Sequence, residues 1–104
     1  MIKANFFSVN GIFTAFSIEG HAGYADEGKD IVCSAVSSAV MTVINGITEC
    51  ADIPAEVSVL NNRIEFNLIQ RNDIAQHFLS ALKLQLELIC EDYEGTIKIT
   101  VTEV

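Results

Sequence analysis

The sequence predicts an α+β fold: a two-layer sandwich in which two helices pack on one face of a mostly antiparallel sheet. Three observations lead to it. Two pairs of segments with period-two alternation each flank a turn, two longer segments have apolar residues throughout or at helical spacing, and an alternating segment follows the second helix. The predicted order is ββαββαβ, which is typical of helices and strands packed as two layers. We expect a single domain over residues 1–104, because this length suits one core.

The first two strands are predicted as a β-hairpin over residues 2–8 and 12–19. Asn10-Gly11 lies between them, and this dipeptide tolerates positive φ at both positions of a tight turn. In the second segment a mostly apolar face alternates with a more polar one. Residues 20–29 are expected to form a loop, because they contain three glycines and have no hydrophobic period.

The first helix is predicted over residues 31–50, with Asp30 as its N-cap and Pro54 preventing its continuation. Apolar residues surround most of its circumference, which is more than one sheet can cover. The surplus must meet the second helix or another protein chain, and in so small a domain it favours a homodimer. The uncharged stretch from Ile31 to Ile47 has 17 residues, the short limit for spanning a bilayer, and it contains several polar side chains. We therefore expect a buried helix and no membrane association.

The second half of the chain repeats this plan. Alternating residues at 57–59 and 64–68 flank an Asn61-Asn62 turn and predict a second hairpin. Residues 97–102 alternate again and predict the last strand.

A second helix is predicted between this hairpin and the last strand. Asn72 or Asp73 can cap it, and Lys83 and Glu87 lie one turn apart on its polar side. Its apolar residues form one stripe, which should lie on the sheet. The stripe consists of Ala75, Phe78, Leu79, Leu82, Leu86 and Ile89.

The charge of the chain indicates which partners it can have. Fourteen acidic residues against six basic ones give a net charge of −8. Binding to DNA or RNA needs a basic surface that neutralises phosphates, so we expect no direct nucleic-acid binding. The same charge repels anionic membranes and favours a basic protein or peptide.

The N-terminal residues and the cysteines predict a cytoplasmic protein. Residues 1–7 hold one lysine and no long apolar core, unlike a signal peptide. The three cysteines are odd in number and have no C-x-x-C spacing, which fits thiols in a reducing compartment.

Cys33 and His21 are the residues that point to chemistry. Cys33 is expected at the third position of the first helix, where N–H groups and the helix dipole favour a thiolate and could form an oxyanion hole. His21 begins the glycine-rich loop, which could fold back over the helix start. Its imidazole could then exchange protons with the thiol and the leaving amine.

Both residues also have plain structural interpretations. A cysteine in an apolar helix is usually a small core residue, and a loop histidine is usually a surface group. The spacing alone therefore leaves catalysis open. Cys50 and Cys90 are assigned no catalytic role, because nothing beside them in the sequence activates a thiol.

The segment G-H-A-G-Y-A-D-E-G-K-D-I-V-C-S-A-V-S resembles the signature of the bacterial ribosomal-processing cysteine proteases, the Prp family. In that family a G-H-A motif and a D-I-V-C motif are joined by a short glycine-bearing loop. The length and the ββαββαβ order fit over essentially the whole chain. The resemblance implies a small homodimeric protease that removes a short N-terminal extension from a large-subunit ribosomal protein, cutting after an aromatic residue and before a small one.

The resemblance also implies roles for individual residues. Cys33 would be the nucleophile and His21 the general acid/base, with Asp30 and Ser37 supporting the site. Asp30 could instead act as the helix cap, which the residues themselves favour. Ser37, one turn after Cys33, could hydrogen-bond near the site or simply pack. The substrate loop would contain Gly20, Gly23, Tyr24 and Gly28, and Tyr24 could pack on an aromatic substrate side chain or lie on the surface.

Three functions follow, from different classes. The first is a cysteine endopeptidase acting on the basic N-terminal peptide of a large-subunit ribosomal protein. The alternative is a non-catalytic, acidic, dimeric binding or assembly factor for such a protein. Metal binding by His21, Cys33 and acidic loop residues is the weakest, because these residues lack a recognisable ligand spacing, and we expect no cofactor or metal.

Overall fold

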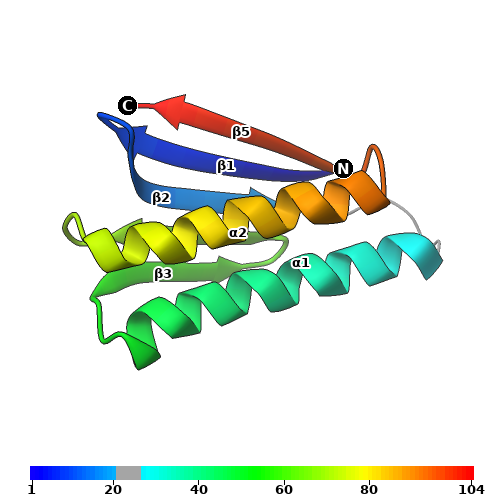
Figure 1. The fold of residues 1–104 in the computed structure, drawn as a ribbon. Helices are drawn as coiled ribbons and strands as arrows, with labels where there is room; N and C mark the ends of the chain where they lie inside the picture. Colours follow the sequence, from blue (N-terminus) through cyan, green and yellow to red (C-terminus); the bar gives the residue numbers. More distant parts are fainter. Residues whose placement is uncertain (21–26) are drawn as a thin grey trace.

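The computed structural model describes residues 1–20 and 27–104, with the backbone alone for residues 27–30. The predicted ββαββαβ order is confirmed, and both long helices cover the same face of one five-stranded sheet (Figure 1). The elements are β1 (Ile2–Val9), β2 (Ile12–Glu19), α1 (Glu27–Asn45), η1 (Gly46–Cys50), β3 (Ala55–Leu60), β4 (Arg63–Leu68), α2 (Asp73–Asp92) and β5 (Ile97–Glu103).

The strand order is β3-β4-β2-β1-β5, with β1 and β5 parallel and the other neighbouring pairs antiparallel. This confirms a mostly antiparallel sheet. The registers place Phe6, Phe16 and Phe66 side by side across its centre, and all three are almost completely buried. The ring centroids of Phe16 and Phe66 lie 5.1 Å apart in a stacked arrangement. Burial of these rings beneath the helices contributes to the hydrophobic stabilisation of the fold.

The predicted start of the first helix was wrong. α1 begins at Glu27, so Asp30 is its fourth residue and not its N-cap, and residues 27–29 are helical rather than part of a loop. No proline interrupts residues 27–30, and acidic side chains are favourable in the first helical turn, so the helix can include these residues. The part of the predicted loop over residues 21–26 lies outside the described residues.

The predicted C-terminal extent of this helix is confirmed, although its last turn is the π-helix η1. Gly46 begins η1 and lies against α2. A Cβ atom there would be 2.6 Å from a ring carbon of Phe78, so glycine permits this close approach of the two helices.

α2 is the more conventional helix. Its predicted cap is confirmed, because the Asn72 side chain accepts a hydrogen bond from the Ala75 N–H at 2.9 Å. The predicted apolar stripe is buried, with Phe78 only half-buried at its edge. Gln76 exchanges two hydrogen bonds with the backbone of Phe13, at 2.7 and 2.6 Å, which ties α2 to β2.

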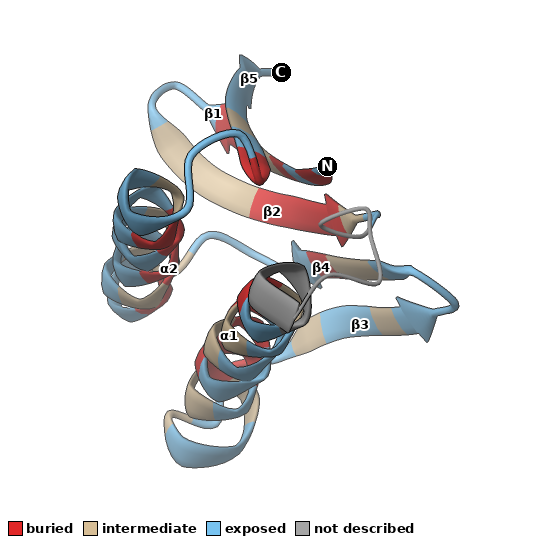
Figure 2. Cartoon of the chain, turned by 90° about the vertical axis from the view of Figure 1, so that its right-hand side faces the viewer, coloured by how far each residue is buried: buried red, intermediate tan, exposed pale blue. Residues whose placement is uncertain are grey.

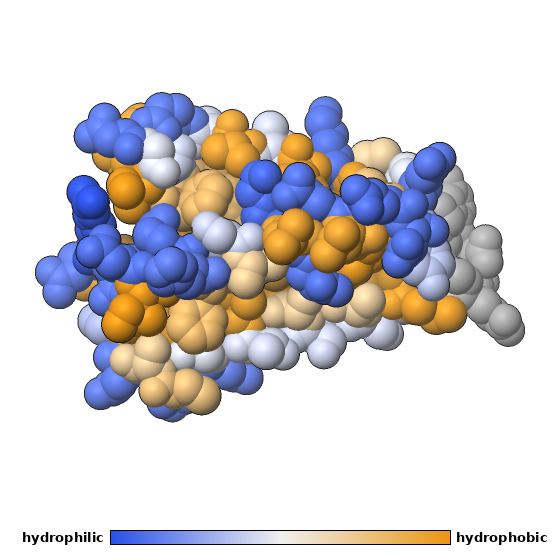
Figure 3. All heavy atoms as spheres, in the orientation of Figure 1, coloured by the Kyte–Doolittle hydropathy of each residue, from blue (hydrophilic) through white to orange (hydrophobic). Residues whose placement is uncertain are grey.

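α1 is a core helix in this fold. By length and composition alone, the stretch Ile31–Cys50 could cross a membrane, but its valine and isoleucine face packs into the same core as the sheet and α2 (Figure 2). Other apolar side chains remain exposed, among them Ile31 at 55% and Met41 at 36%. Figure 3 shows that apolar patches on the helix side of the molecule are interrupted by hydrophilic groups. A homodimer stays a prediction.

Candidate active site

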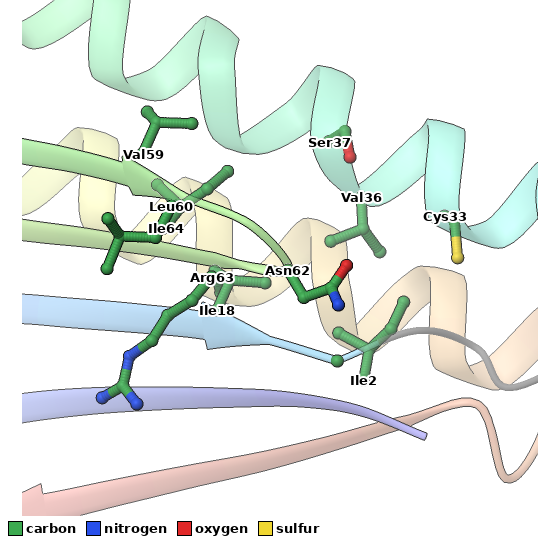
Figure 4. A pocket seen from close by; sticks show the side chains of 11 residues that line it. Ile2, Ile18, Cys33, Val36, Ser37, Val59, Leu60, Asn62, Arg63 and Ile64 are labelled. Atoms are coloured by element: carbon green, nitrogen blue, oxygen red, sulfur yellow. The ribbon is translucent and has the colours of Figure 1, made fainter.

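A pocket of about 260 Å³ lies between the N-terminal half of α1 and the strand ends below it (Figure 4). Its lining combines residues from β1, β2, α1, β3, β4 and the turn between β3 and β4. These are Ile2, Ile18, Gly20, Cys33, Val36, Ser37, Val59, Leu60, Asn62, Arg63 and Ile64. The fold therefore brings three of the predicted site residues, Gly20, Cys33 and Ser37, to one pocket.

Cys33 and Ser37 lie one helical turn apart on the wall that α1 contributes. Cys33 is half-buried and Ser37 is exposed, so the thiol can be reached from the pocket without lying on an open surface. Helical geometry thus gives Ser37 the predicted place next to the thiol. Its function there stays a prediction.

The expected position of Cys33 within the helix was wrong. Because α1 starts at Glu27, Cys33 is the seventh helical residue and not the third. Only the first four N–H groups of a helix lack an intrahelical acceptor. The N–H of Cys33 is therefore not one of the terminal donors, and the predicted oxyanion hole at a helix start does not apply at this residue.

Gly20 connects the pocket to the segment that carries His21. Its N–H donates to the Asn62 carbonyl at 3.0 Å, its φ is +89°, and an added Cβ would lie 2.7 Å from the Met1 carbonyl oxygen. Only glycine suits this position without strain. His21 follows Gly20 directly in the sequence but, with Gly23 and Tyr24, lies outside the described residues. The predicted pairing of His21 with Cys33 is therefore untested.

Asp30 and Gly28 lie in the first turns of α1. This excludes the cap role for Asp30 and places Gly28 in the helix backbone instead of a loop. Their side-chain surroundings are outside the described structure, so the alternative role of Asp30, orienting His21, stays a prediction.

The pocket is mostly apolar. Among the described residues that line it, Arg63 alone is charged, and it is ion-paired with Glu19 at 3.2 Å and Glu65 at 2.7 Å. The Arg63 guanidinium points away from Cys33 (Figure 4). An apolar wall beside a thiol suits an apolar substrate side chain next to the reacting carbonyl.

The pocket wall opposite α1 contains residues that were not predicted as site residues. Asn62 was assigned only to a turn, and Leu60, between the predicted strand and that turn, received no role, yet both line the pocket. The one sequence signal available was the turn itself, and no local pattern shows that this turn lies opposite Cys33.

The other two cysteines are arranged differently. All three cysteines lie in the described part of the chain, and none forms a disulfide. Cys50 is exposed at the end of η1, whereas the Cys90 thiol donates to the Ile97 carbonyl at 3.3 Å. Among the described side chains, those of residues 1–20 and 31–104, no group of three or more His, Cys, Asp or Glu is arranged to hold a metal ion.

Comparison with known proteins shows the family to which the chain belongs. The sequence model of a family described as Cysteine protease Prp matches residues 1–98. The chain belongs to the Prp family. As a Prp protein it is a cysteine protease, a hydrolase with a thiol nucleophile, and the family resemblance noted in its sequence is confirmed.

Individual Prp proteins resemble the chain over most of its length. A ribosomal processing cysteine protease Prp of Staphylococcus aureus is 27% identical over 92 residues, which cover 86% of this chain and 87% of the relative. A crystal structure of the essential S. aureus ribosomal processing protease Prp with a covalently linked product peptide covers 98% of this chain and 100% of its own. It has a TM-score of 0.89 and 24% identity. A second structure, with a substrate peptide, has the same coverage, a TM-score of 0.87 and 23% identity. These two structures confirm the predicted fold.

Proposed function

We propose that this Prp protein removes the short N-terminal extension of a large-subunit ribosomal protein, with Cys33 as nucleophile and His21 as general acid/base. The observation that carries the proposal is the half-buried Cys33 thiol on the wall of an apolar pocket. The S. aureus relative supports the substrate class, because its name is ribosomal processing cysteine protease and its solved structures contain a substrate peptide and a covalently linked product peptide.

The proposed reaction is acyl transfer through a thioester. Cys33 Sγ attacks the scissile carbonyl carbon while His21 accepts the thiol proton. The C–N bond then breaks, and the same proton passes to the leaving amine. Water attacks the thioester with His21 as base, which releases the carboxylate product and restores the thiol. Ser37 contributes a hydroxyl one turn from Cys33, where it can hydrogen-bond to the bound peptide.

The pocket fits the specificity that the family resemblance implies. Ile2, Ile18, Val36, Leu60 and Ile64 give it an apolar lining, in which the aromatic residue before the cut can be buried. A small residue after the cut leaves room for the peptide to pass Cys33.

The proposal also covers the partner, the oligomeric state and the location of the protein. The net charge of −8 attracts the basic N-terminus of a ribosomal protein and disfavours direct contact with nucleic acid. The exposed apolar groups of α1 support a homodimer, and a ribosomal-protein substrate supports a cytoplasmic location.

The proposal is tested by incubating the purified protein with the precursor of the ribosomal protein and identifying the products by mass spectrometry. We expect one new pair of termini, formed by wild-type protein and absent with Cys33→Ala. Stoichiometric binding without new termini would contradict the proposal and favour the alternative function, a non-catalytic assembly factor.

A further inference from the structure

We propose that the substrate backbone pairs with the free edge of β3 and adds one strand to the sheet, so that the sheet itself guides the peptide to Cys33. This inference rests on the proposed function, because it describes how the same peptide is held. The occupant is the extended segment next to the scissile bond.

β3 is an edge strand with an open side. Within residues 1–20 and 27–104 it is paired with β4 alone, and it stands at the end of the strand order. An edge strand presents N–H and C=O groups to any extended chain beside it, and natural proteins usually protect such edges with lysine, proline or bulges. Residues 55–60 contain no lysine and no proline, and their pairing with β4 is regular.

The side chains of β3 are unusually apolar for an exposed edge. Val59 is 64% exposed, Leu60 58% and Val57 38%. Exposed apolar side chains at a strand edge are what an added strand would partly cover. An exposed apolar edge strand promotes aggregation unless something covers it. Binding of a substrate peptide along β3 would explain why this edge is left unprotected.

The edge leads directly into the Cys33 pocket. Val59 and Leu60, at the C-terminal end of β3, line that pocket together with Cys33 and Ser37 (Figure 4). The six residues of β3 extend for about 20 Å at roughly 3.3 Å per residue. An extended peptide of similar length can therefore lie along β3 and place its next peptide bond at the thiol.

The charge around this edge suits a basic peptide. Glu56 on β3 and Glu49 and Asp52 before its start are all exposed. Arg63, which follows the β3–β4 turn, is already ion-paired with Glu19 and Glu65. A peptide carrying lysine or arginine would therefore meet unpaired carboxylates along the strand.

The first experiment measures binding of synthetic cleavage-site peptides to full-length Cys33→Ala protein by fluorescence anisotropy. Single backbone N-methyl groups are placed at successive peptide positions. Strand addition predicts an alternating pattern, because only every second N–H faces the edge. Methylation at those positions should weaken binding about tenfold, the size of one lost hydrogen bond, and the intervening positions should change by less than about twofold. A flat profile would overturn the proposal.

The second experiment compares the two edges of the sheet in otherwise wild-type protein. Val101 on β5 is a valine at the opposite edge, 47% exposed, and it does not line the Cys33 pocket. Val59→Lys adds a charge that repels a basic peptide and protects the edge, so KM should rise about tenfold. Val101→Lys should leave KM within about twofold. Equal effects of the two variants would contradict strand addition at β3.

The outcomes for the two proposals can be told apart. If wild-type protein cleaves the unmodified peptide but the N-methyl profile is flat, strand addition is wrong and the proposed protease function stands. If wild-type protein neither binds nor cleaves the peptide, both are wrong.

Discussion

The sheet has a cysteine pocket at each of its edges, and the two pockets differ in charge. At the β3 edge, Cys33 of α1 lies among apolar side chains, and the described lining has no carboxylate. At the β5 edge, Cys90 of α2 lines a pocket of about 660 Å³ with three glutamates and one lysine. Both thiols are half-buried, so their exposure does not distinguish them.

The surroundings do distinguish them. The Cys90 thiol donates to the Ile97 carbonyl, a contact that joins α2 to β5. Cys33 lies on the wall of a mostly apolar pocket, with Ser37 one helical turn away. Two half-buried cysteines thus differ in their neighbours: Cys90 holds α2 against β5, whereas Cys33 lines the pocket proposed to take the substrate.

The largest expected effect is on the two thiols themselves. Cys33→Ala should lower kcat/KM for the ribosomal precursor at least about 1,000-fold, because it removes the atom that forms the thioester. Cys90→Ala should retain cleavage within about threefold. Steady-state kinetics of both variants, with circular dichroism to verify folding, checks the pair. Equal losses of kcat/KM in the two variants would contradict the assignment of Cys33, and not Cys90, as the nucleophile.

The second effect concerns the two histidines. His21→Ala should lower kcat by about 100- to 10,000-fold, the range for loss of a general acid/base. His77 is exposed on α2 and provides the matched control, with an expected change of less than about twofold. Initial cleavage rates at saturating substrate measure both. Wild-type activity of His21→Ala would remove this residue from the mechanism.

The third effect compares two glycines, one near each pocket. Gly20→Ala combines a φ of +89° with a Cβ placed 2.7 Å from the Met1 carbonyl oxygen, so we expect a stability loss of about 2–4 kcal/mol and reduced cleavage. Gly95 has a φ of +76° but open space around its Cβ position, so Gly95→Ala should cost about 1 kcal/mol and leave cleavage unchanged.

Urea unfolding of the two glycine variants measures the difference. If Gly95→Ala were as damaging as Gly20→Ala, the close approach of Gly20 to Met1 would not be the cause.

The smallest expected effect is a change in the pKa of Glu103, at the end of β5. Hydrogen bonds from the Ser8 hydroxyl and from the backbone N–H groups of Asn10 and Gly11 lower the pKa of Glu103 below its usual value. A lowered folded-state pKa means that this contribution to stability is present above the usual carboxyl range and is lost as pH falls through the lowered value. Ser8→Ala should return the pKa of Glu103 toward normal and leave cleavage unchanged.

Carboxyl carbon NMR titration follows Glu103 directly. An unchanged Glu103 titration in Ser8→Ala would contradict the assigned cause.

The parts of the fold that the sequence predicted are those with local signals. Period-two alternation located the strands, and Asn72 identified the start of α2 because a cap depends on residues only a few positions apart. The start of α1 was placed too late, because Asp30 satisfies the local cap pattern although the helix already includes it. A cap pattern indicates only where a helix can begin.

Only the wall of the candidate site that α1 forms was predictable, because the sequence motif lies on that helix. Cys33 and Ser37 share a face of one helix, and that follows from their spacing. Leu60 and Asn62 reach the same pocket through the pairing of β2 with β4, which places the β3–β4 turn beside Gly20. Such long-range contacts depend on strand order, and no local pattern in this sequence specifies that order.

The role of Cys33 as nucleophile is tested most directly by finding which thiol reacts with a substrate-like electrophile. Wild-type protein is treated briefly with a cleavage-site peptide that ends in a thiol-reactive group, and the labelled residue is identified by peptide mapping and mass spectrometry. We expect one adduct, on Cys33, and protection by excess unmodified peptide. Labelling of Cys90 or Cys50 at an equal rate, or no protection of Cys33, would exclude Cys33 as the nucleophile.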